Sequence, residues 1–179
     1  MRELVITAVG RDRPGIVGRL TAPIYRASAN VADSRMVNLR GRFAVILLAE
    51  VSEEQLAPLQ AELRAAAQEL QLNLSFHDEA PQEREGQAVG VPYRLRTHAM
   101  DQPGLVHRLT DRLQQHAINV EELTTRSQPR PQTGAPLFSM DLRITVPTEV
   151  SIKALRAELE QLCDELNCDV ELVRDGLRE

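Results

Sequence analysis

Two short turns in the sequence carry residues suited to holding an anion. Residues 12–17 read Asp-Arg-Pro-Gly-Ile-Val, and residues 101–106, 89 positions later, read Asp-Gln-Pro-Gly-Leu-Val. Each stands between an apolar run and a segment with helical spacing, so each would present the unpaired amides of a helix N-terminus. The glycine leaves room there for a carboxylate. The alternative is an ordinary helix start, with Asp12 as the cap and Pro14 in the first turn.

The same spacing recurs elsewhere in the chain and sets its organisation. Leu20-Thr21 returns as Leu109-Thr110, and Asn30-Val31 returns as Asn119-Val120. An internal repeat of this length predicts two similar domains rather than one. We place them at residues 1–78 and 90–179, joined by a linker at 79–89 that has no apolar period.

The apolar pattern of each repeat predicts the elements that would position these turns. In the first repeat we expect strands at residues 4–9, 31–39, 43–51 and 72–76, with one helix after the turn and another from about residue 57, because Pro58 disfavours an earlier start. This is a β-α-β-β-α-β unit, so the predicted fold class is α+β, with two ferredoxin-like antiparallel sheets that carry helices on one face. In the second repeat, residues 128–136 replace the tight hairpin turn of the first.

The two repeats differ on the sheet face that the helices leave open. Alternate positions in the first and third strands are apolar in the first repeat, whereas the second repeat has arginines, a histidine and an aspartate there. An apolar face of this kind is unfavourable in water. We therefore expect it to bind a second copy of the chain or a regulated partner, or else to be covered by the linker or a terminal segment. Its central residues are Val5, Val9, Ile46 and Leu48.

Composition excludes several classes of function. The four histidines and two cysteines show no metal-ligand spacing, and no phosphate loop or nucleophile motif is present, so we expect neither an enzyme nor a bound metal or cofactor. Seven arginines lie in residues 11–42, but the chain carries a net charge of −5 and no recognition-helix motif, which argues against direct DNA binding. The longest apolar run is too short for a membrane span, so we expect a cytoplasmic protein.

Three segments together identify a family resemblance. Residues 5–17, then Asp33-Ser34-Arg35, then residues 118–120 with 126–129 resemble the tandem ACT-domain proteins. The resemblance covers both repeats and implies an amino-acid-responsive regulator whose ACT units sit side by side, with effector sites near the contact between domains. The second copy departs at Gln102, where the first has Arg13. The effector-binding positions that the resemblance implies are Asp12, Arg13, Pro14, Gly15, Ile16, Asn30, Asp101, Gly104, Leu105 and Asn119.

The resemblance implies a non-enzymatic sensor of a small amino acid, with glycine as the first candidate, that controls a transcriptional activator by protein contact. A regulatory subunit of a metabolic enzyme is the main alternative. Direct nucleic-acid binding through the arginine-rich segment is a third.

Overall fold

The computed structural model describes residues 1–77, 90–129 and 136–176. The chain divides into two compact units, Met1–Glu85 and Gly86–Glu179. The predicted linker at residues 79–89 and the centre of the predicted hairpin insertion lie outside the described residues.

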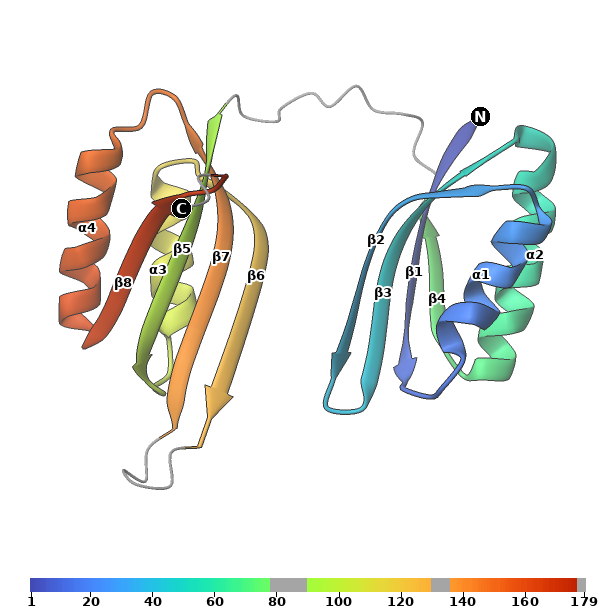
Figure 1. The fold of residues 1–179 in the computed structure, drawn as a ribbon, viewed down its shortest axis with the longest axis horizontal. Helices are drawn as coiled ribbons and strands as arrows, with labels where there is room; N and C mark the ends of the chain where they lie inside the picture. Colours follow the sequence, from blue (N-terminus) through green and yellow to red (C-terminus); the bar gives the residue numbers. More distant parts are fainter. Residues whose placement is uncertain (78–89, 130–135, 177–179) are drawn as a thin grey trace. The chain divides into compact units, whose positions relative to one another are not determined.

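The first unit follows the predicted β-α-β-β-α-β order. Its four strands form one antiparallel sheet in the order β2-β3-β1-β4, and both helices cover the same face (Figure 1). The second unit repeats this plan in the order β6-β7-β5-β8. The predicted fold class is therefore confirmed. The elements are β1 (Arg2–Arg11), α1 (Ile16–Arg26), β2 (Asn30–Leu39), β3 (Arg42–Val51), α2 (Glu53–Leu70), β4 (Asn73–His77), β5 (Gly90–Met100), α3 (Leu105–Gln115), β6 (Asn119–Gln128), β7 (Leu137–Pro147), α4 (Ile152–Glu165) and β8 (Cys168–Arg174).

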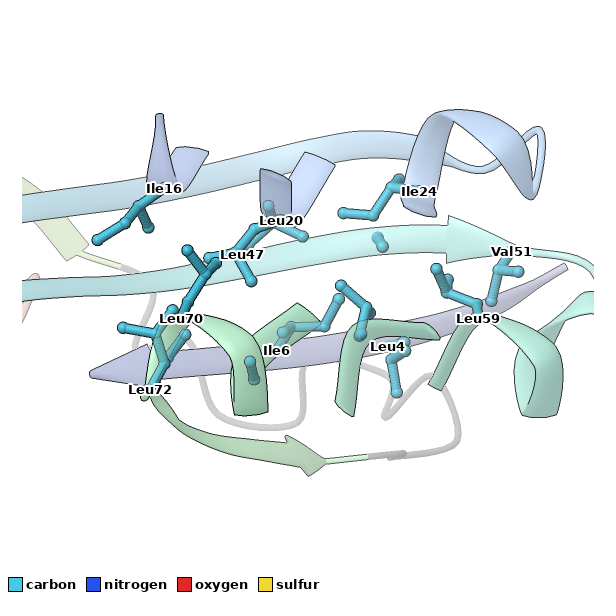
Figure 2. Close-up of a cluster of buried hydrophobic side chains, with 14 of the residues drawn as sticks. Leu4, Ile6, Ile16, Leu20, Ile24, Leu47, Val51, Leu59, Leu70 and Leu72 are labelled. Carbon is cyan, nitrogen blue, oxygen red and sulfur yellow. The ribbon is translucent and has the colours of Figure 1, made fainter. Parts of the chain in front are cut away.

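Each unit has its own hydrophobic core between sheet and helices. Figure 2 shows the first, in which side chains of α1 and α2 meet Leu4 and Ile6 of β1 and Leu47 of β3. Leu59 of α2 is only 1% exposed. Full burial of one leucine side chain stabilises a fold by about 2 kcal/mol, so this layer holds the sheet and helices together. The second core is built from equivalent positions, including Leu95, Leu142 and Leu155.

Two expectations about helix starts were wrong. Helix α2 begins at Glu53, so Pro58 lies inside it rather than at its edge. Proline there removes only the bond to the Glu54 carbonyl, and Glu54 is exposed, so water replaces the lost donor. Helix α1 begins at Ile16 with Gly15 as its N-cap, which places Pro14 before the helix rather than in its first turn.

Ion pairs join the two helices of each unit. In the first, Arg26 contacts Glu62 at 2.7 Å, and Arg19 contacts Glu69. In the second, Glu158 of α4 accepts from His116 at 2.8 Å and from Arg112 at 3.3 Å. The hydrogen bond from His116, and then the Arg112 guanidinium, lower the pKa of Glu158 below its ordinary value of 4.5.

The lowered pKa of Glu158 gives a pH-dependent contribution to stability. A carboxylate whose pKa is lower in the folded state stabilises the fold above its unfolded pKa, and this contribution is lost as pH falls through the folded pKa. We expect Glu158→Gln to lower the melting temperature at pH 7 and to differ little from wild type at pH 3. Melting curves at both pH values test this. Glu160→Gln is the control, because Glu160 lies on the same helix without an ion pair among the described residues. Equal changes in melting temperature for Glu158→Gln and Glu160→Gln would contradict the stabilising role of the Glu158 ion pairs.

Candidate functional site

The two predicted turns have the same backbone shape. Gly15 has φ of +87° and Gly104 has φ of +92°, a left-handed conformation that glycine adopts without strain. A Cβ added at either position would meet nothing within 4 Å. Each glycine therefore leaves open space over the first turn of an 11-residue helix. The amides at that helix end favour an anion.

Asp12 and Asp101 tie their turns to the neighbouring hairpin. Neither α1 nor α3 has a side-chain cap, so the expectation that Asp12 caps the helix was wrong. Instead, the Asp12 carboxylate accepts from the Asn38 amide at 2.5 Å, and its backbone N–H donates to Gly41 O at 2.9 Å. Asp101 accepts from the Ser127 hydroxyl at 2.7 Å. Both aspartates thus fix the turn against the tip of a two-strand ribbon.

The residues after each aspartate tie the turn to the end of the second helix. Arg13 donates to the Gln71 side chain at 2.6 Å. Gln102 donates to the Leu166 carbonyl at 2.5 Å. Gln102 replaces Arg13 in the second repeat, so the donor differs. The turn is still hydrogen-bonded to the end of the second helix of its unit.

The remaining turn residues divide into exposed and buried ones. Pro14 is exposed, like both glycines. Ile16 is 2% exposed and Leu105 is 3% exposed, because both side chains belong to the cores. Only their backbone amides can face a ligand.

Asn30 and Asn119 lie at the opposite end of their sheets from the turns. Asn30 is paired with Glu50, which is paired with Glu3 near the start of β1, whereas Asn38 lies beside the end of β1. The length of β2 from Asn30 to Asn38 is roughly 27 Å. A single unit therefore does not bring either asparagine to its own turn.

The open face of the first sheet brings the predicted apolar residues together. Val5 is paired with Leu48, and Ile46 lies two residues before Leu48 on β3, on the same face of the sheet. Ile46 is 50% exposed and Val9 is 46% exposed. Asp33, Ser34 and Arg35 of β2 border a shallow hollow of about 210 Å³ over Val5, Ile46 and Leu48. Sequence reasoning did not assign these rim residues to the surface, although alternation along β2 could have placed Asp33 and Arg35 on the face of Leu48 and Ile46, their partners on β3.

No metal centre is found in the described part of the chain. Within residues 1–77, 90–129 and 136–176, no group of three His, Cys, Asp or Glu side chains could hold a metal ion. Burial raises the pKa of the Cys163 and Cys168 thiols, so both stay protonated at neutral pH and are poor nucleophiles. No helix in these ranges is both long and apolar enough to cross a membrane.

Comparison with known proteins agrees with the fold. The profile of the ACT domain matches residues 2–77. The glycine cleavage system transcriptional repressor of Escherichia coli is 29% identical over 164 residues, which cover 92% of this chain and 85% of that protein. A UPF0237 protein of Methanopyrus kandleri is 33% identical over 81 residues, which cover 44% of this chain and 90% of that protein.

A solved structure extends the likeness to both units. The crystal structure of an unknown protein from Galdieria sulphuraria superposes with a TM-score of 0.85 at 27% identity, and the match covers 97% of this chain and 98% of that one. The repeated turn, the repeated topology and these matches lead to one conclusion: residues 2–77 form an ACT domain, and the second unit repeats the topology of that domain.

Proposed function

We propose that this protein is an amino-acid-responsive repressor of glycine cleavage genes that acts in the cytoplasm by contact with a transcriptional activator. The observation that carries this proposal is the similarity to the glycine cleavage system transcriptional repressor over 92% of the chain. The acidic net charge of −5 favours contact with a protein rather than with DNA directly. No catalytic step is part of this function.

The amino-acid effector binds at the Asp12 and Asp101 turns in this proposal. Its carboxylate meets the first-turn amides beside Gly15 or Gly104, where a glycine leaves space. Asn30 lies too far from Gly15 in the same unit to join this site. β2 is an edge strand, and antiparallel pairing with β2 of a second copy would bring Asn30 of one copy toward the turn of the other. In this proposal, the effector site is complete only in a homodimer, where Asn30 of one copy joins the turn of the other.

The open face around Val5, Val9, Ile46 and Leu48 is the proposed contact for the activator. Its exposed apolar side chains gain from being removed from water, and the Asp33–Arg35 rim supplies polar contacts around them. The rival function, a regulatory subunit of an amino-acid metabolic enzyme, uses the same surface. It predicts copurification with that enzyme and a change in its kinetics.

Titration of Gly15→Asn with glycine tests the effector site. Asparagine tolerates positive φ, so the fold should persist while the side chain fills the space over the amides. We expect wild type to bind glycine saturably in calorimetry, and the affinity at the first turn to fall at least about tenfold in the variant, the effect of losing a charge-assisted hydrogen bond. Binding at the Gly104 turn should persist.

Gly176→Asn is the matched control, because Gly176 also has positive φ with nothing within 4 Å, yet follows β8 in the second unit. The control should bind like wild type. Unchanged affinity in folded Gly15→Asn would contradict the proposed site.

A further inference from the structure

The open face of the second sheet carries a hollow of about 420 Å³. Side chains of three neighbouring strands, β5, β6 and β7, line it, and helices cover only the other face of this sheet (Figure 1). Its ionisable residues are Arg94, Arg96, His98, Glu122, Arg126 and Asp141.

Two of the arginines are already held in place by Asp141. Its carboxylate contacts Arg94 Nε at 3.0 Å and Arg96 Nε at 3.3 Å, and Arg96 also contacts Glu171 at 3.4 Å. These contacts pre-organise one side of the hollow. They also neutralise much of the charge that Arg94 and Arg96 bring to it.

Arg126 and His98 differ from this pair. Among the described residues, neither side chain has a hydrogen-bond or ion-pair partner. The register places Arg126 opposite Ser139, and Ser139 opposite His98, so the three form one row across β6, β7 and β5. Two strand spacings separate the backbones of Arg126 and His98 by about 10 Å. The hollow of about 420 Å³ that both residues line has room for a group of a few atoms.

The charge of the hollow selects an anion. The lining holds three arginines and two carboxylates, and outside it Glu171 contacts Arg96 and Arg143 contacts Glu122. Arg126 is the lining arginine that has no ion pair among the described residues. Thr124 adds a hydroxyl donor on β6, and the Ser139 hydroxyl on β7 makes only a long bond of 3.5 Å to the Arg126 carbonyl, which a ligand would replace. The first unit has no such site, because Ala44 and Ile46 occupy the positions of Ser139 and Asp141. The hollow therefore depends on the side chains of the second unit, since the first unit has the same fold without them.

We propose that this hollow binds a small carboxylate, such as a free amino acid, with the carboxylate held by Arg126, His98 and the Ser139 hydroxyl. The ligand class rests on the proposed function, but the site is distinct from both glycine turns. Glu122, on the same strand as Arg126, also lines the hollow and contacts Arg143 at 3.6 Å. The two units would then differ in role, the first presenting an apolar docking face and the second an additional ligand site.

Backbone amide NMR of the full chain tests this proposal and keeps it separate from the turn sites. Glycine, acetate and ethylamine are the probes. Glycine and acetate should shift the amides of β5, β6 and β7 around His98, Arg126 and Ser139 saturably, whereas ethylamine should not. Shifts at residues 12–17 or 101–106 report the turns instead.

Arg126→Gln should weaken the open-face response to glycine and acetate about tenfold, because it removes a charged donor. It should leave any response at the turns unchanged. Arg174→Gln is the control, since Arg174 is exposed in β8 and does not line the hollow. Saturable shifts at the turns without shifts on the open face would overturn this proposal but would remain consistent with the proposed function. Open-face shifts that Arg126→Gln leaves intact, or that ethylamine also produces, would overturn it as well. Open-face shifts without turn shifts would support it and count against the turns.

Discussion

Replacement of Ile46 by arginine is expected to abolish contact with the protein partner while the fold persists. Ile46 lies on β3 beside Leu48, and its cross-strand neighbour on β1 is Thr7. A guanidinium buried in an apolar interface without a partner charge is strongly unfavourable, and we expect partner affinity to fall about a hundredfold or more. Surface-immobilised activator and purified chain give this affinity directly.

The fold should tolerate this substitution because the second unit already carries charge at the same place. Asp141 of β7 occupies the position equivalent to Ile46 and is half-buried on the open face. Tyr25→Arg is the control, since Tyr25 is 84% exposed on α1, which packs on the opposite face of the sheet. Far-ultraviolet circular dichroism should be unchanged for both variants. Partner affinity that survives Ile46→Arg would remove the open face from the account, whereas equal loss with Tyr25→Arg would show a nonspecific effect of charge.

The sequence was sufficient to predict most of the fold. Hydrophobic alternation is determined by burial, and in the predicted strand at residues 43–51 it separates Phe43 and Leu47, which are buried, from Ile46 on the open face. The same alternation predicted the exposed apolar positions Val9 and Ile46. Comparison of the repeats helped, because two copies of one topology show which positions the core requires.

Local sequence pattern does not predict contacts between residues that are distant in the chain. Asp12 has the residue type of a helix cap, but its partner is Asn38 on a hairpin that only the folded sheet brings near. Asn30 follows α1 in sequence, but α1 carries the chain away from the turn, so β2 begins at the far end of the sheet and returns to the turn only at Asn38. The row of Arg126, Ser139 and His98 depends on register across three strands, which local pattern does not determine.

The anchors of the first turn also connect the two proposed sites. Asp12 binds both Asn38 and Gly41, at the tip of the ribbon formed by β2 and β3. β3 continues from this tip to Ile46 and Leu48 on the open face. A ligand that shifts the turn is therefore expected to shift the surface that meets the partner. Coupling between two sites of one protein is commonly about 5–150-fold in affinity.

The central claim is that amino-acid occupancy controls contact with another protein. The most direct test is the affinity of the chain for the activator, measured with and without saturating glycine. We expect glycine to change this affinity about tenfold, and the change to disappear in Gly15→Asn. Equal affinity with and without glycine, in wild-type protein that binds both molecules, would contradict the account.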